Sequence, residues 1–337
     1  LFRSPDNISP EFIAKEVEFY KSVQNKMKNV LYSDLSNDDK TVFDVLKYTL
    51  DDRIEAYRFH PEYIPFHQMG GLPLSFPLLG SGEGSQPFKT VKEYEDWLKR
   101  MQQFPAWMNS ATENFKKGIA AKIVLPKKLV LKMIPQMRAA EITSSDFEKN
   151  IFYGPVRKFP NDFSLKDKER LTELFKKSVT ENIIPAYQKM GDFLEKEYLP
   201  KARTTDGYNS LPNGNKMYAF YAKTWTTTDK TPDEINKTGL QQVAMLRAEM
   251  QKIQQQLGFQ GTLEEFIVHV KSDRSAMPYK TPEEVLAGFN GILEKITPKL
   301  KTMFSVTPKT GFEIRRTEKF REASASEIGR ASCRERV

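Results

Sequence analysis

Two tyrosines that follow a turn are the side chains in this chain best suited to chemistry. Tyr218 and Tyr221 come soon after the turn formed by residues 211–214, Leu-Pro-Asn-Gly. A phenol hydroxyl can donate a hydrogen bond to the oxyanion that forms when an amide is attacked. Tyrosine is also common in cores, where its ring is buried and its hydroxyl reaches water. The sequence leaves both roles open, so Tyr218 and Tyr221 are candidate cleft residues of unknown catalytic role.

A histidine and a glutamine are candidates for substrate binding. His67 and Gln68 come shortly before Gly70 and Gly71, within a stretch rich in proline and glycine (residues 60–87). A loop of this kind can present polar groups to a cleft. The alternative, which the sequence favours, is a glycine-assisted turn in which the histidine forms its hydrogen bonds locally.

Arg315 is a third candidate for substrate binding. It lies in the segment FEIRRTEKFRE, and its guanidinium could hold a substrate carboxylate through two hydrogen bonds. It could equally pair with Glu313 or Glu318 at the surface.

No metal site is expected within this chain. Apart from His67, the histidines are His60 and His269, and no two histidines stand four residues apart, as a helical zinc pair requires. The motifs of zincins, of nucleophile-elbow hydrolases, of P-loop proteins and of dinucleotide-binding proteins are also absent.

Helix-start signals dominate the chain and predict a mostly α, multi-helix fold. Serine or threonine caps stand before prolines or acids, and apolar residues recur behind them every three or four positions. The longest such pattern covers residues 164–198, where Pro185 should kink or break the helix. Sheet is limited to at most a short β element near residues 217–225. Helices are expected to begin at Ser9, near Asn37, and at Thr90, Ser164, Thr231, Thr262 and Thr281.

The charge pattern gives no sign of a nucleic-acid partner. The 337 residues include 52 Lys and Arg against 44 Asp and Glu, a formal net charge of +8. Bases alternate with acids, as in KEVEFYK, which is typical of solvated helix faces. No run approaches the ~18 apolar residues of a membrane-spanning helix, so we expect no transmembrane segment.

Residues 327–337, EIGRASCRERV, are expected to be a non-native tail. Back-translated, the segment resembles read-through into a common short-read sequencing adapter, and we exclude it from fold reasoning. The alternative is a short, basic, disordered tail. The tail holds Cys333 and three arginines against two glutamates, so the rest of the chain has no cysteine and a formal charge of +7.

Four segments in fixed order together resemble the bacterial domain-of-unknown-function 885 family. They are FYGPVRKFP, EYLPKARTTDGYNSLPNG with Tyr218 following, TPDEINKTGLQQVAMLRAEM and FEIRRTEKFREASAS. The resemblance runs from near Phe12 to Ser326. It implies a metallopeptidase-like helical architecture, because members are similar to helical zinc metallopeptidases and generally carry a His-Glu-x-x-x-Gly-His-His type motif in their C-terminal half. One departure is Asn236, where the family pattern has histidine.

The resemblance implies that residues 1–326 are the incomplete N-terminal portion of a single large, zinc-dependent, peptidase-like hydrolase domain. The zinc motif would follow Ser326, so this chain should hold no cofactor and should be inactive by itself. The intact parent would use zinc to cleave a peptide or small amide. The alternative is a complete, non-enzymatic helical binding protein. The compartment is left open: relatives are often exported, to the periplasm or envelope, and a signal would precede Leu1.

Overall fold

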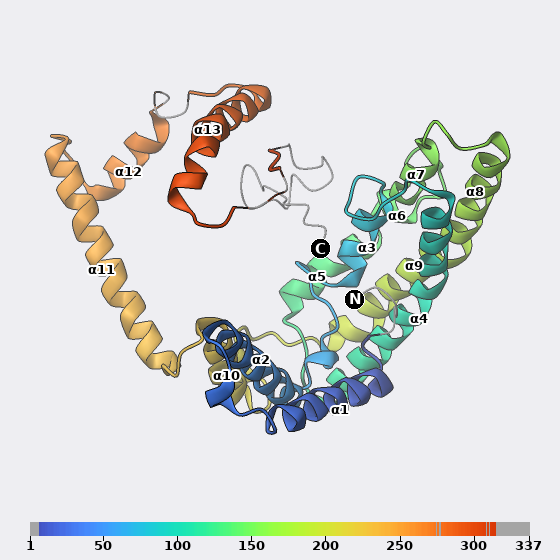
Figure 1. Cartoon of the computed structure of the whole chain (residues 1–337), viewed down its shortest axis with the longest axis horizontal. Coiled ribbons are helices and arrows are strands. Elements are labelled where there is room, and N and C mark those ends of the chain that lie inside the picture. The colour runs from blue at the N-terminus through green and yellow to red at the C-terminus, as the bar shows by residue number, and fades with distance from the viewer. Residues whose placement is uncertain (1–6, 274, 276–277, 308, 310, 315–337) are drawn as a thin grey trace. The chain divides into compact units, whose positions relative to one another are not determined.

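The structure is a computed structural model that describes residues 7–273, 275, 278–307, 309 and 311–314 (Figure 1). These residues contain no β-strand, which confirms the mostly α, multi-helix fold class. The α-helices in chain order are α1 (Pro10–Met27), α2 (Asn37–Ala56), α3 (Leu72–Gly80), α4 (Val91–Ala121), α5 (Lys127–Met137), α6 (Ala140–Thr143), α7 (Gly154–Arg157), α8 (Leu165–Ser178), α9 (Ile184–Phe193), α10 (Gly214–Thr226), α11 (Pro232–Gln256), α12 (Leu263–Ser272) and α13 (Pro282–Met303).

The chain divides into two compact units, with the boundary between Ile235 and Asn236. The expectation that residues 1–326 belong to one domain stays a prediction. The tail at 327–337 lies outside the described residues. None of the described helices combines the length and the apolar character that a membrane crossing needs.

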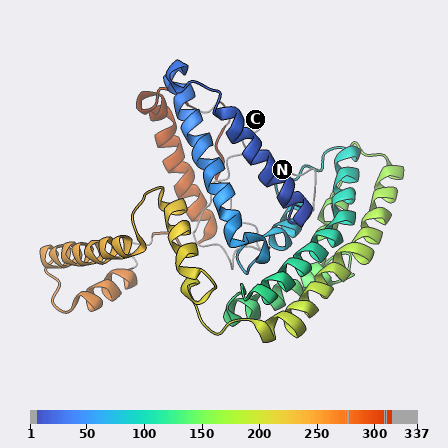
Figure 2. The ribbon, with the colours of Figure 1, turned by 90° about the horizontal axis from the view of Figure 1, so that it is seen from below.

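The first unit is built around α4, which is 31 residues long. Its apolar residues recur every three or four positions from Tyr94 to Phe115, and they form its buried face. Helices α8 and α9 run along this face (Figure 2). The core between the elements is aromatic: Phe76 stacks on Phe104 and on Trp97, with ring centroids 4.4 and 4.7 Å apart.

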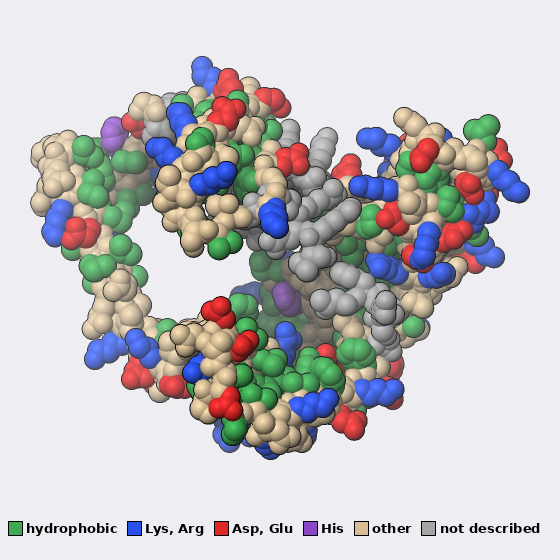
Figure 3. Space-filling model, in the orientation of Figure 1, with side chains coloured by type: hydrophobic (Ala, Val, Ile, Leu, Met, Phe, Trp, Pro, Cys, Tyr) green, Lys and Arg blue, Asp and Glu red, His purple; other side chains and the backbone are tan. Residues whose placement is uncertain are grey.

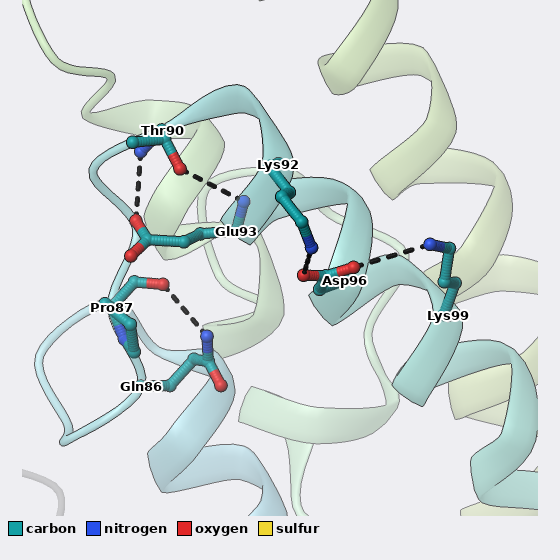
Figure 4. Close-up of polar contacts among 7 residues, drawn as sticks. All are labelled: Gln86, Pro87, Thr90, Lys92, Glu93, Asp96 and Lys99. Carbon is teal, nitrogen blue, oxygen red and sulfur yellow. Dashed lines mark hydrogen bonds and ion pairs between the residues drawn. The ribbon is translucent and has the colours of Figure 1, made fainter. Parts of the chain in front are cut away.

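A capping box starts α4 at the predicted Thr90. The Thr90 hydroxyl accepts a hydrogen bond from the Glu93 amide at 3.3 Å, and the Glu93 carboxylate accepts one from the Thr90 amide at 3.0 Å (Figure 4). Asp96, one turn later, accepts from Lys92 at 2.5 Å and from Lys99 at 3.4 Å. The capping box gives hydrogen-bond partners to the first amides of α4, and the Asp96 pairs add side-chain contacts along its exposed face.

Pro185 interrupts the long helix with a wider turn and does not end it. Ser164 caps α8 by accepting from the Asp167 amide at 3.0 Å, as predicted. A π-helical turn at Val179–Ile183 then leads directly into α9, with Pro185 in the first turn of α9. Proline has no amide hydrogen and its ring clashes with the preceding turn of an α-helix. A π-turn widens the helix at that point, so the chain continues to Phe193 and beyond.

No strand forms near residues 217–225, where the sequence allowed at most a short β element, because this segment is part of α10. Its aromatic residues favour a strand by local propensity. However, Met217 and Phe220 are buried while Tyr218 is 52% exposed, which is the pattern of one helical face. Gly214, the last residue of the predicted turn at 211–214, is the first residue of the helix.

The second unit is helical as predicted, but its described part buries few side chains. Capping boxes start α12 at Thr262 and α13 at Thr281. In the described residues of this unit, only Gln254, Leu263 and Phe266 are buried. The apolar stripe of α11 is exposed, as the green side chains along that helix show (Figure 3).

One close backbone contact and the hydrogen bonds of one arginine hold the FYGPVRKFP segment in the first unit. A Cβ at Gly154 would overlap the carbonyl oxygen of Ser81, so only glycine fits there. The guanidinium of Arg157 donates to the carbonyls of Phe147 (2.5 Å), Glu148 (3.1 Å) and Asn150 (3.1 Å). This arginine therefore binds the loop carbonyls of Phe147 and Glu148, and it shares the Asn150 carbonyl with the Tyr153 amide.

Three fully buried tyrosines place their hydroxyls against backbone groups. Tyr94 donates to the carbonyl of Pro155 at 3.0 Å, and Tyr187 donates to that of Pro73 at 2.7 Å. The hydroxyl of Tyr198 accepts from the Leu125 amide at 2.9 Å. Burial is the main cause that raises the pKa of Tyr94 and of Tyr198, each to about 12.

We expect Gly154→Ala to lower the free energy of unfolding by about 1–3 kcal/mol, because the added methyl must displace the Ser81 backbone. The matched control is Gly291→Ala in α13, where a Cβ meets no atom within 4 Å. That substitution should stabilise by up to about 1 kcal/mol, since alanine is the better helix former. Urea unfolding followed by far-UV circular dichroism measures both. Equal effects at the two positions would contradict the packing at Gly154.

The buried tyrosines should make stability fall with rising pH above about pH 10. The unfolded chain releases phenol protons near the ordinary pKa of 10.0, whereas folded Tyr198 keeps its proton up to about 12. The stabilisation from each such group is complete below pH 10 and is lost as the pH rises through 12, by about 1.4 kcal/mol per pH unit. Urea midpoints between pH 8 and 11.5 test this. The slope should be smaller for Tyr198→Phe, and an unchanged slope would refute the assignment.

Candidate functional site

The two candidate tyrosines are both on α10, and a third tyrosine, Tyr208, packs against them from the preceding loop. The ring of Tyr208 lies 6.5 Å from that of Tyr218 and 5.5 Å from that of Tyr221, centroid to centroid. We call these three residues the tyrosine cluster. In the described part of the chain, none of their hydroxyls forms a hydrogen bond with another residue. Tyr208 and Tyr218 are 42% and 52% exposed, so the cluster is open to a ligand.

Arg203 positions the loop that carries Tyr208. Its Nη1 donates to the carbonyls of Thr205 (2.7 Å) and Gly207 (2.9 Å) and to the hydroxyl of Ser210 (2.8 Å). Its Nε donates to the carbonyl of Val124 at 3.0 Å, which ties the loop to the segment before α5. Burial is the main cause that lowers the pKa of this guanidinium. The planar fork of arginine suits several carbonyl acceptors at once.

Two glycines let the loop meet the start of α10. Gly207 has a φ of +70°, in the region that favours glycine. A Cβ at Gly214 would overlap the carbonyl oxygen of Tyr208. The backbone of Tyr208 therefore rests directly on the first turn of α10, and this contact brings its ring to Tyr218 and Tyr221.

Residues of α10 that neighbour Tyr221 contact the end of α2 and the segment after it. The hydroxyl of Thr224 donates to Asp52 at 2.5 Å. The rings of Phe220 and Phe59 lie 5.2 Å apart. Tyr221 follows Phe220 directly and precedes Thr224 by about one helical turn. The contacts of Phe220 and Thr224 therefore bring residues 52–63 near Tyr221.

A histidine–glutamate pair follows Phe59. Nδ1 of His60 lies 2.9 Å from Oε1 of Glu62, and an ionised Glu62 requires that this nitrogen donate. The imidazole also stacks on the ring of Tyr63, with centroids 4.5 Å apart. Oε2 of Glu62 is buried and has no hydrogen-bond partner. His60 has a φ of +51°, so the pair depends on a backbone conformation that costs energy for histidine.

Tyr221 lies in surroundings that keep its phenol protonated. Burial is the main cause that raises its pKa, and the charges of Tyr208, Asp52 and Glu62 add to the rise. A neutral phenol is a hydrogen-bond donor. Tyr221 can therefore donate to a carbonyl or oxyanion at ordinary pH.

His67 and Gln68 lie in a tight turn of their own. The amide of His67 donates to Gly70 at 3.0 Å, and its Nδ1 accepts from the Met69 amide at 3.2 Å. Gln136 of α5 donates to the carbonyl of Gln68 at 2.9 Å. Among the described residues, no hydrogen bond, ion pair or ring contact joins His67 or Gln68 to the tyrosine cluster. This geometry is that of the alternative we favoured, a turn with a locally bonded histidine.

Two further residues named in the sequence analysis remain, Arg315 and Asn236. Arg315 lies outside the described residues. Asn236, at the position where the family pattern has histidine, is an exposed residue of α11 in the second unit.

The described residues do not fit a zinc site by themselves. No group of three histidine, cysteine, aspartate or glutamate side chains close enough to hold a metal occurs among them. Protein zinc sites commonly use at least three such ligands. We therefore derive no chemical step through a metal from these residues.

Most of the residues that lie near the tyrosines could not be identified from the sequence. Asp52 and Thr224 are 172 positions apart, and no local pattern connects them. Glu62 was overlooked, and His60 was considered only as a metal ligand. A signal did exist for Tyr208, because Arg203 and Gly207 precede it in a loop that also contains Gly214.

The chain was compared with family models, curated proteins and solved structures. Residues 3–334 match the family described as bacterial protein of unknown function, DUF885. None of the curated proteins matches the chain. One similar solved structure is described as "the putative lipoprotein from Colwellia psychrerythraea"; it is 22% identical, with a TM-score of 0.77, over 94% of this chain and 56% of that chain.

This chain therefore spans little more than half of the length of that solved relative. At 22% identity, the likeness shows a shared fold. The family match covers nearly the whole chain and confirms the resemblance carried by the four sequence segments. The chain belongs to the DUF885 family of bacterial proteins.

Proposed function

We propose that this chain forms the substrate-binding wall of a zinc-dependent, peptidase-like hydrolase. The observation that carries the proposal is the tyrosine cluster, whose hydroxyls have no partner among the described residues; the charges of Asp52 and Glu62 reach one of its members, Tyr221. Open phenol donors in fixed positions suit a ligand that has carbonyl oxygens, as a peptide or a small amide does. In this role, Tyr221 donates to the carbonyl oxygen under attack and Tyr218 donates to a neighbouring one.

The zinc ion remains an expectation from the family resemblance. Its ligands would come from sequence outside the residues described here. Zinc would polarise the carbonyl group and activate water. What the described residues do is bind the substrate: Arg203 holds the loop, the loop holds Tyr208, and Tyr208 packs against both tyrosines of α10.

A specific observation keeps a non-enzymatic binding protein as the second candidate. Helices α11 and α13 expose several large apolar side chains, among them Leu246, Ile253, Phe289 and Ile296. Exposed apolar stripes of this kind mark interaction surfaces. A binding protein would use these faces and would show no hydrolysis.

An exported location is part of the same proposal. The similar solved structure is described as a lipoprotein of Colwellia psychrerythraea, which supports an envelope location for its relatives. Fractionation of cells that express the full-length parent, followed by immunoblotting, tests this location.

The test of the hydrolase uses the full-length parent and a peptide library. We expect cleavage that a chelator abolishes and zinc restores. In Tyr221→Phe, kcat on a verified substrate should fall roughly 10²-fold, because one donor to the oxyanion is lost. Zinc content and melting temperature should not change. Tyr32→Phe is the matched control, since Tyr32 bonds Asp44 away from α10. Full activity in both Tyr218→Phe and Tyr221→Phe would make the tyrosines purely structural.

Arg203→Lys should lower kcat through the position of Tyr208. Lysine cannot reproduce the four hydrogen bonds of the guanidinium, so the loop loosens. A double-mutant cycle separates this effect from a general loss of stability. If Arg203 acts through the cluster, adding Tyr221→Phe to Arg203→Lys lowers kcat by less than the product of the two single effects. Arg247→Lys, at an exposed ion pair with Glu264, is the control. Fully multiplicative effects would refute the positioning role.

A further inference from the structure

Two carboxylates near Tyr221 have unused capacity to accept hydrogen bonds: Asp52, which bonds Thr224 one helical turn after Tyr221, and Glu62, whose charge also reaches Tyr221. One oxygen of Glu62 takes the bond from His60, while Oε2 is buried and accepts none. The Glu62 side chain as a whole is 15% exposed. Oδ1 of Asp52 takes the Thr224 hydroxyl. A buried carboxylate oxygen without a donor is unfavourable, so a donor brought by a ligand would stabilise it.

No lysine or arginine of the described residues forms an ion pair with either of these two acids. Glu62 pairs only with His60, and Asp52 forms no ion pair in the described part of the chain. Lys223, the lysine of α10 nearest in sequence to Tyr221, pairs with Asp229 at 2.8 Å. Arg203 is committed to backbone carbonyls and a hydroxyl. The neighbourhood of Tyr221 is therefore negative, which agrees with the raised pKa of its phenol.

Aromatic faces complete the surroundings. Tyr208 meets Tyr218 and Tyr221 at interplanar angles of 34° and 44°, so the three rings present inclined faces. The face of a tyrosine ring attracts a cation within about 6 Å of its centroid. Rings and carboxylates together select an ammonium group, which needs both negative charge and hydrogen-bond acceptors.

We propose that Tyr208, Tyr218 and Tyr221, with Asp52 and Glu62, bind the ammonium group of the ligand. The substrate class is then peptides or amides that carry a free amino group. This inference rests on the proposed function in taking the tyrosine cluster as the substrate-contacting surface. It adds that the ligand is cationic, and the binding can be measured without turnover.

The test titrates the full chain with two probes, alanyl-alanine amide and its N-acetylated form, by isothermal calorimetry at pH 7.5. We expect the free amine to bind roughly tenfold more tightly, because a charge-assisted contact is worth that much. Asp52→Asn and Glu62→Gln should each remove most of this preference. Asp44→Asn on the same helix, where the carboxylate only accepts from Tyr32, should retain it. Circular dichroism checks that each variant is folded.

A second pair of variants tests the rings. Tyr218→Phe keeps the aromatic face and should retain amine binding, whereas Tyr218→Leu should weaken it several-fold. Equal affinity for the two probes, or full amine preference in both carboxylate variants, overturns the inference. Failure here is distinguishable from failure of the proposed function: a parent enzyme that cleaves acetylated and free peptides alike remains a hydrolase without an ammonium site. Amine binding by a parent that cleaves nothing supports this inference and rejects the hydrolase.

Discussion

The position of the tyrosine cluster depends on the hydrogen bonds that the Arg203 guanidinium donates. The eight residues 203–210 form a connection outside the α-helices of the first unit, so their backbone carbonyls are not paired within an α-helix. Arg203 binds two of these carbonyls and the Ser210 hydroxyl, and it reaches Val124 as well. Gly214 then admits the Tyr208 backbone at the start of α10. The guanidinium is the group that joins this loop to Val124, while the close approach at Gly214 sets the Tyr208 backbone against α10.

Arg157 performs the same physical task in the FYGPVRKFP segment, where it binds three carbonyls. Gly154 makes the accompanying close approach to Ser81. Two of the four segments that carried the family resemblance thus share one arrangement, an arginine that binds loop carbonyls beside a glycine that allows another backbone to approach closely. Their pattern in the sequence is explained by backbone hydrogen bonding, and only the second segment also supplies open polar side chains.

Local signals predicted the helices well and the site only in part. The caps at Thr90, Ser164, Thr262 and Thr281 act within one turn, so a sequence contains all that decides them. The error at α10 came from aromatic residues, whose strand propensity gave way to burial of Met217 and Phe220 on one face. The pairing of α10 with Asp52 and Glu62 could not be predicted, because it depends on how distant helices pack. The turn at His67 attracted attention for its glycines, yet its bonds are local.

In α11 and α13 the helix starts are fully capped, although the apolar side chains behind the caps are not buried. Thr231 and Thr281 begin α11 and α13 with complete reciprocal hydrogen bonds. Behind these caps, α11 and the residue after it place large apolar side chains at alternating intervals of three and four residues, and all are exposed: Val243, Leu246, Met250, Ile253 and Leu257. An amphipathic helix gains most of its stability when such a stripe is buried. In the similar solved structure, much of the chain has no counterpart here. The apolar stripe that makes α11 easy to predict therefore also implies a surface that covers it. In a hydrolase this surface would come from the same chain, and in a binding protein it would come from another chain.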